Sequence, residues 1–276
     1  MRTVITRRAF SRYLGLVALA SAAASVSIPL HARDTAAGSA HDDAPRVAAA
    51  SDLKFALDEI MADFRRETGF EVRVTYGSSG NFARQIEQGA PYDLFLSADE
   101  ALVFRLADRA LTRDRGTLYA IGRIALYAPH DSPLEPDPAM EHLARRLADG
   151  SSGRIAIANP SHAPYGRAAE QALRKLGLWD RIAPRLVLGE NVAQAAQFAA
   201  SGNTDGGIIA YSLALAPALG ERGRFALLPE SLHAPLRQRM VLTRQATPQA
   251  RRLYEYLQSP AARAILGRYG FVLPED

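Results

Sequence analysis

Apolar and polar residues follow two periods along this chain, the two-residue period of a strand and the 3.6-residue period of a helix. Residues 70–76 alternate apolar and polar side chains, which predicts a strand. A Gly/Ser turn follows, and Phe82, Ala83 and Ile86 then recur at helical spacing. This succession of strand, turn and helix is repeated along the whole chain. Such alternation is typical of α/β folds with parallel strands.

The hydrophobic pattern predicts further elements on both sides of a segment that is rich in proline and aspartate. Strands are expected over residues 46–50, 93–97, 121–129, 155–158, 185–188, 206–210 and 237–242. Helices are expected over 51–67, from Ser79, from Ala98, over 167–176 and 192–200, from Tyr211 and over most of 248–266. The proline-rich segment, residues 130–138, is interpreted as a lobe boundary. The sequence therefore predicts two α/β lobes whose helix N-termini face one cleft.

The first 45 residues differ in character from the rest. Residues 6–12 contain paired arginines followed by Phe10 and resemble a twin-arginine motif. Residues 13–28 are apolar, and Leu30-His31-Ala32 offers a small-residue cleavage site. A membrane anchor is the alternative, but the apolar run is short for a stable span and a polar linker follows it. We expect a cleaved signal peptide over 1–32, a linker over 33–45, and export to the periplasm.

Composition excludes several classes of site. The chain has no cysteine, so it has no disulfide framework, thiolate metal site or cysteine nucleophile. The net charge of +4 does not indicate nucleic acid as a partner, since Arg2, Arg7, Arg8 and Arg12 lie in the expected signal peptide. The remaining 29 basic and 29 acidic residues balance, because 33 minus 4 equals the 29 acidic residues.

Two serines stand where a strand ends and a helix begins. Ser79 follows the strand at 70–76 and Ser51 follows the strand at 46–50. A helix N-terminus presents unpaired N–H groups and a partial positive charge, so it favours anions. Each serine alone is also compatible with a plain helix cap. Because adjacent parallel strands end at one edge of a sheet, we expect both hydroxyls to face one ligand.

Catalytic motifs are weak. The sequence has no G-x-S-x-G elbow, no phosphate-binding lysine loop and no H-E-x-x-H pair. His162 is compatible with a general base and with a polar loop residue. An exported serine hydrolase with Ser79 as nucleophile remains an alternative, but it lacks a base and an orienting group in recognisable spacing. We therefore expect a protein that is not an enzyme and has no cofactor.

Motifs spread over residues 46 to 276 resemble those of the periplasmic molybdate-binding proteins of ABC transporters, which are type II periplasmic binding proteins. The resemblance rests on residues 48–53 and 78–99, on Asn159-Pro160 with Pro164-Tyr165-Gly166, and on 176–179, 190–192, 207–212 and 269–271. It implies two lobes that close like a hinged clamp on a ligand cleft. Lobe 1 would comprise 46–124 and 229–276, and lobe 2 would comprise 125–228.

The resemblance also implies a ligand, a partner and the residues of the site. The ligand would be molybdate, together with tungstate, delivered by a monomer to the membrane permease of an ABC transporter, with no role for nucleic acid. The metal would be bound only as its oxyanion, by Ser51, Ser79, Tyr165, Val192 and Tyr211. Tyr165 and Val192 would each contribute a backbone N–H. Some relatives carry the last tyrosine one position earlier, where this chain has Ala210, so either Tyr165 or Tyr211 supplies the hydroxyl.

The chemistry of these anions agrees with that set. Molybdate and tungstate are deprotonated near neutral pH and only accept hydrogen bonds, so a site made of N–H and O–H donors suits them. Phosphate is partly protonated and would require an acceptor. Asp52 lies beside this site, and we expect its carboxylate to face away from the anion as a first-turn helix acid. A receptor for sulfate or another tetrahedral oxyanion on the same fold remains the alternative, because sulfate is equally a pure acceptor.

Overall fold

The computed structural model describes residues 44–275. The expected signal peptide, its cleavage site and the linker up to residue 43 lie outside the described residues. Within residues 44–275, no helix is both long enough and apolar enough to cross a bilayer.

The first lobe is built on a five-stranded mixed sheet. Its strand order is β2 (Arg73–Gly77), β1 (Arg46–Ala50), β3 (Leu94–Ser97), β10 (Leu236–Leu242) and β4 (Thr117–Gly122). The strands β2, β1 and β3 are parallel, and β10 is antiparallel to both of its neighbours. The strands β1 and β3 are mostly apolar and are buried on both faces except at Arg46, which explains their central place.

A second five-stranded mixed sheet forms the other lobe. Its order is β7 (Leu186–Gly189), β6 (Ile155–Ala158), β8 (Gly206–Ala210), β5 (Ile124–Pro129) and β9 (Gly223–Leu227). Here β7, β6 and β8 are parallel, while β5 is antiparallel to β8 and β9. Each sheet thus has three neighbouring parallel strands whose carboxyl ends lie at one edge.

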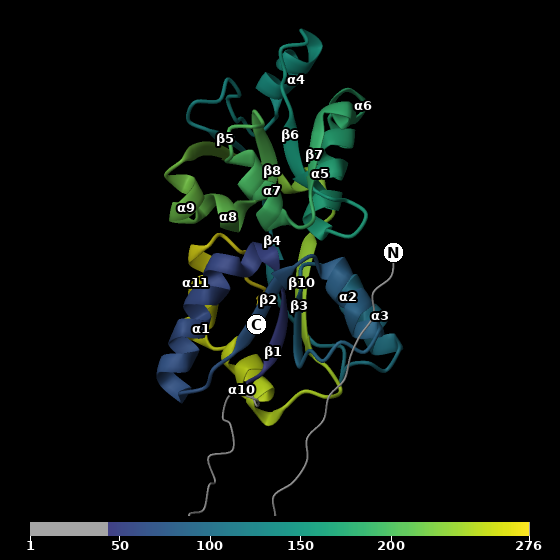
Figure 1. The fold of residues 1–276 in the computed structure, drawn as a ribbon, viewed down its shortest axis with the longest axis vertical. Helices are drawn as coiled ribbons and strands as arrows, with labels where there is room; N and C mark the ends of the chain where they lie inside the picture. Colours follow the sequence, from purple (N-terminus) through teal and green to yellow (C-terminus); the bar gives the residue numbers. More distant parts are fainter. Residues whose placement is uncertain (1–43, 276) are drawn as a thin grey trace, which may run out of the picture. The chain divides into compact units, whose positions relative to one another are not determined.

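Helices cover the faces of both sheets (Figure 1). Those of the first lobe are η1 (Ser51–Leu53), α1 (Lys54–Thr68), α2 (Ser79–Glu87), α3 (Glu100–Asp108), α10 (Pro248–Tyr256) and α11 (Pro260–Arg268). Those in the segment of the second lobe are α4 (Glu141–Ala148), α5 (Pro164–Lys175), α6 (Trp179–Ile182), η2 (Ala183–Arg185), α7 (Val192–Ala199), α8 (Tyr211–Leu215) and α9 (Pro217–Gly220), and η3 (Glu230–Leu232) precedes β10. The predicted two-lobed α/β fold is confirmed.

The helix α1 shows how the pattern becomes packing. Its apolar positions Ala56, Leu57, Ile60 and Phe64 are at most 1% exposed, as the helical spacing predicts. Burial of each large side chain contributes roughly 1.5–3 kcal/mol to folding. Gly69 ends the helix in the left-handed region, at φ 73°, where its N–H donates to the carbonyl of Arg65.

Two predictions about the lobe boundary need correction. The single strand expected over 121–129 is wrong, because the chain breaks at Arg123 into β4 of one sheet and β5 of the other. The segment 130–138 is a loop between β5 and α4, and the strands β5 and β6 on either side of it belong to the same sheet. The chain therefore passes between lobes at Arg123, and the residue-level limits of the lobes stay a prediction.

Candidate functional site

A small cavity lies where the parallel strands of both sheets end. Its lining comes from five segments, residues 50–52, 77–79, Ala98, 163–165 and 191–192. The first three follow the ends of β1, β2 and β3, and the last two follow β6 and β7. The cavity measures about 10 Å³. The two sheets thus bring their carboxyl edges to one site, as parallel α/β topology favours.

Four of the five predicted binding residues line this cavity: Ser51, Ser79, Tyr165 and Val192. All four are at most 3% exposed. Tyr211 is not among the lining residues. Its ring lies edge-on to Phe225 at 6.0 Å and covers Gly270, where an added Cβ would lie 2.6 Å from the tyrosine ring. Packing rather than the cavity therefore accounts for the position of Tyr211.

The two serine hydroxyls are arranged to donate. The N–H of Ala193 donates to Ser51 Oγ at 3.2 Å, and the N–H of Ala98 donates to Ser79 Oγ at 3.0 Å. A hydroxyl carries one donor hydrogen and can accept through its lone pairs. Because each oxygen already accepts a backbone N–H, its own hydrogen remains available for an acceptor in the cavity.

Backbone donors add to the hydroxyls. Ser79 is the first residue of α2, Val192 is the first residue of α7, and Tyr165 is the second residue of α5. The first N–H groups of a helix have no intrahelical acceptor, and the helix dipole adds partial positive charge there. The described residues that line the cavity include no lysine or arginine. The site can therefore bind an anion through dipoles and hydrogen bonds without a formal positive charge.

Asp52 also lines the cavity and, as expected, is an acid in the first turn of η1, but its side chain is buried. It is 1% exposed, and its Oδ2 accepts hydrogen bonds from Tyr165 Oη at 2.9 Å and Gln238 Nε2 at 2.6 Å. Burial raises the pKa of this carboxyl to about 6, although the two hydrogen bonds act in the opposite direction. Burial also raises the pKa of Tyr165 well above its usual value, and the nearby Asp52 adds to this shift.

Direct hydrogen bonds join the two lobes beside the cavity. The carbonyl oxygen of His162 accepts from Gly80 N at 3.0 Å and from Ser78 Oγ at 2.6 Å. The Ser212 hydroxyl donates to the carbonyl of Asp52 at 2.8 Å. The turn that bears Ser79 is therefore held against the second lobe, and the structure shows the lobes drawn together.

The position of His162 does not support Ser79 as the nucleophile of a hydrolase. Its Nδ1 lies 3.0 Å from Ser78 Oγ, and its Nε2 lies 3.4 Å from Glu190 Oε2. Among the described residues, Ser79 has no histidine partner, and its hydroxyl oxygen accepts a backbone N–H instead. His162 is a loop residue at the contact between the lobes, where its backbone carbonyl accepts the hydrogen bonds from Gly80 and Ser78.

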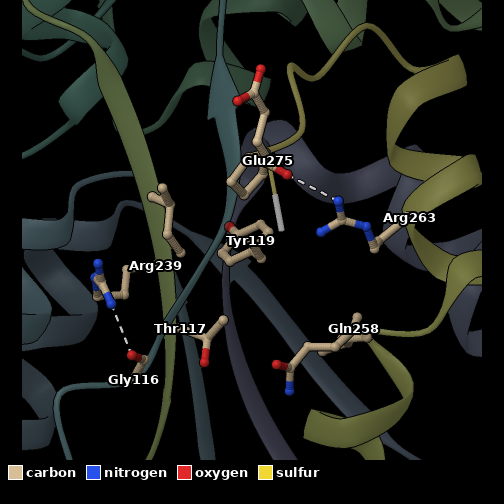
Figure 2. A pocket seen from close by; sticks show the side chains of 10 residues that line it. Gly116, Thr117, Tyr119, Arg239, Gln258, Arg263 and Glu275 are labelled. Carbon is tan, nitrogen blue, oxygen red and sulfur yellow. Dashed lines mark hydrogen bonds between the residues drawn. The ribbon is translucent and has the colours of Figure 1, made fainter.

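A larger cavity of about 550 Å³ lies elsewhere and contains none of the predicted binding residues. Figure 2 shows Arg239 and Arg263 in its lining, each directed to a main-chain carbonyl. Arg239 donates to Gly116 O at 2.8 Å and Arg263 donates to Pro274 O at 2.9 Å. We assign the candidate site to the smaller cavity because the uncharged donors of both lobes meet there.

Sequence reasoning missed Gln238, which is fully buried next to the site. The signal was present in β10, where Leu236, Gln238 and Met240 occupy the buried phase of a strand that alternates with exposed or half-buried arginines. A glutamine in the buried phase needs polar partners, because an unpaired buried amide is costly. Asn191 and Ala98, which also line the cavity, were seen only as parts of a turn and a helix start.

Comparisons with known proteins agree with this geometry. Residues 45–272 match the family described as bacterial extracellular solute-binding protein. The chain is 34% identical over 217 residues to the molybdate-binding protein ModA of Rhodobacter capsulatus, covering 78% of this chain and 82% of the relative. It is also 34% identical over 232 residues to the molybdate-binding protein ModA of Escherichia coli K12, covering 82% of this chain and 88% of the relative.

A solved structure shows the same architecture. The periplasmic molybdate-binding protein of Azotobacter vinelandii superposes with a TM-score of 0.76 at 32% identity, covering 84% of this chain and all of that one. The family match over residues 45–272 includes every segment that lines the small cavity.

Proposed function

Since this chain belongs to the bacterial extracellular solute-binding proteins, we propose that it captures molybdate outside the cytoplasm and delivers it to the permease of an ABC transporter. Its similarity to molybdate-binding proteins of three bacteria, over most of both chains, supports this ligand and this partner. The family is one of binding proteins rather than enzymes, and molybdate is the transported ligand rather than a cofactor.

The observation that carries the proposal is the set of uncharged donors from both lobes around one cavity. Ser51 and Ser79 offer hydroxyl hydrogens, and Ser79, Tyr165 and Val192 offer first-turn N–H groups. Molybdate has four acceptor oxygens and no donor. We propose that these four residues hold the oxyanion, with no direct bond to the metal atom, and that the hydroxyl of Tyr211 does not take part.

Binding requires the lobes to move. A cavity of about 10 Å³ holds no more than about one water molecule, whereas molybdate has four oxygens around its metal. The chain passes between the lobes at Arg123 and again between β9 and β10, so a few residues can serve as a hinge. Molybdate would enter a more open form, and the lobes would then close on it.

The finer expectations belong to the same proposal. Tungstate is a tetrahedral dianion with the same acceptor character, so we expect it to bind as well. The family and the relatives support a periplasmic location. We further propose export through the twin-arginine-like segment and action as a monomer. Sulfate is the competing ligand on this fold, and only the closed volume of the site would discriminate against it.

Isothermal titration of the mature chain with molybdate, tungstate, sulfate and phosphate tests the proposal. We expect binding of molybdate and tungstate, little response to the other two anions, and roughly 10- to 100-fold weaker molybdate binding by Ser79→Ala, which loses a hydrogen bond to a charged group. Ser231→Ala, an exposed serine outside the cavity, is the matched control. Preference for sulfate would overturn the ligand, and binding of none of the four would overturn the proposal.

A further inference from the structure

Four buried polar side chains form a continuous hydrogen-bonded group behind the anion cavity. Tyr119 on β4 donates to Gln238 Oε1 at 2.8 Å. Gln238 Nε2 donates to Asp52 Oδ2 at 2.6 Å and to Tyr165 Oη at 3.0 Å. Tyr165 Oη in turn donates to Asp52 Oδ2 at 2.9 Å. All four residues are at most 4% exposed, so the group is shielded from solvent.

This group joins the lobes at the binding site itself. Asp52, Tyr119 and Gln238 belong to the first lobe, whereas Tyr165 belongs to α5 of the second lobe. Asp52 directly follows the binding serine Ser51, and Tyr165 carries one of the proposed backbone donors. A hydrogen bond to a buried carboxylate is stronger than a neutral one, because the charge is poorly screened.

The backbone beside the group leaves room for it. Gly122 ends β4 just before the chain crosses to the second lobe at Arg123. A Cβ at residue 122 would lie 2.2 Å from Tyr165 Oη and 2.7 Å from Gln238 Nε2. The Tyr165 hydroxyl therefore fits against the crossing strand only when the lobes are drawn together and residue 122 has no side chain.

We propose that Asp52 is a positioning residue: its carboxylate, held by Gln238, binds the Tyr165 hydroxyl in the closed form and so keeps the N-terminus of α5 on the anion. This rests on the proposed function. The contact spans the two lobes, so it is broken when they separate and does not act on the first encounter with the anion. It therefore slows release of molybdate and leaves association nearly unchanged.

Release and association rates distinguish this role from a merely structural one. Radiolabelled molybdate bound to the full mature chain is chased with unlabelled molybdate, and association is followed separately. We expect Tyr165→Phe, which keeps the ring and the backbone N–H, to release molybdate roughly 10-fold faster or more, with association changed less than about 2-fold. Asp52→Ala should act in the same direction.

Two further variants test the pairing. In the double variant Asp52→Ala/Tyr165→Phe, molybdate release should be no faster than in the stronger single variant. The reason is that each change alone already removes the hydrogen bond between Tyr165 and Asp52. Asp52→Asn keeps an oxygen acceptor for the tyrosine and should restore release to within about 3-fold of the unmodified protein. Unchanged release in Tyr165→Phe, or effects of the two single changes that multiply, would overturn the proposal. Failure of the unmodified protein to bind molybdate would instead overturn the proposed function.

Discussion

Gly80 and His162 meet at the contact between the lobes with no space for a side chain. The Gly80 N–H donates to the His162 carbonyl at 3.0 Å, and a Cβ on residue 80 would lie 2.4 Å from that oxygen. The obstructing atom belongs to the backbone and cannot turn aside. Gly80 is the second residue of α2, directly after Ser79, so the two lobes are in close backbone contact at the binding turn.

Gly80→Ala should therefore weaken molybdate binding by at least about 10-fold. The new methyl group prevents the second-lobe donors from reaching an anion held by the first lobe, and each hydrogen bond to a charged ligand is worth roughly 1.5–3 kcal/mol. Calorimetric titration measures the loss. The free energy of unfolding should not fall in parallel, because alanine suits a helix better than glycine.

Gly267→Ala is the matched control for this change. Gly267 lies in α11, where an added Cβ meets only Leu273 Cδ1 at an ordinary 3.8 Å. It should stabilise the fold by up to about 1 kcal/mol and leave affinity unchanged. Full affinity in Gly80→Ala would show that the lobes close differently around the anion.

The buried Asp52 carboxyl predicts a stability that depends on pH. Its pKa is about 6 in the folded protein and 3.8 in an unfolded chain, because burial disfavours the charged form. The folded state therefore holds this proton more tightly than the unfolded chain does. The stabilisation of the fold by protonated Asp52 is fully present below about pH 4 and is lost as the pH rises through about 6. The loss amounts to about 3 kcal/mol.

Denaturant unfolding at several pH values checks this expectation. Asp52→Asn removes the titration, so the difference in unfolding free energy between Asp52→Asn and the unmodified protein should grow in favour of the variant between pH 4 and pH 7. Other ionisable groups are common to both proteins and cancel in the difference. A difference that stays constant over this range would contradict the raised pKa.

An ion pair between the two lobes should make a small contribution to molybdate affinity, and this contribution should decrease as the salt concentration rises. Arg167 Nη2 on α5 lies 2.5 Å from Oδ2 of Asp99, the residue that precedes α3. Both side chains are partly exposed. Exposed pairs are worth at most about 1 kcal/mol, so Arg167→Gln should weaken molybdate binding by less than about 5-fold. The effect should nearly vanish near 1 M salt, where screening acts over about 3 Å.

Arg174→Gln on the same helix is the control, since Arg174 pairs with Glu170 within α5. Titrations at low and high salt should show no change for it at either concentration. A loss for Arg167→Gln that persists at high salt would mean that the guanidinium acts on the ligand itself rather than on closure.

The two tyrosines implied by family resemblance should differ in effect. Tyr211 packs against Phe225 and Gly270 and does not line the cavity, so Tyr211→Phe should change molybdate affinity by no more than about 2-fold. Calorimetric titration beside Tyr165→Phe provides the comparison. A loss of 10-fold or more in Tyr211→Phe would place its hydroxyl in the site.

Local patterns in the sequence were sufficient for most elements and for half of the site. The α1 stripe and the succession of strand and helix at Ser51 and Ser79 follow from hydrophobic periodicity, which acts over a few residues. The parallel order of strands then places both serines at one sheet edge. Tyr165 and Val192 came from family resemblance, because a backbone N–H donor has no side-chain signature.

Only the tertiary structure decided how the two lobes meet. The division of residues 121–129 between two sheets, the packing of Tyr211 and the burial of Asp52 depend on contacts that no local pattern encodes. Asp52 pairs with Tyr165 across 113 positions and with Gln238 across 186. Such pairs are set by the packing of whole lobes, because the free energy of a buried carboxylate depends on which groups surround it and not on its neighbours in sequence.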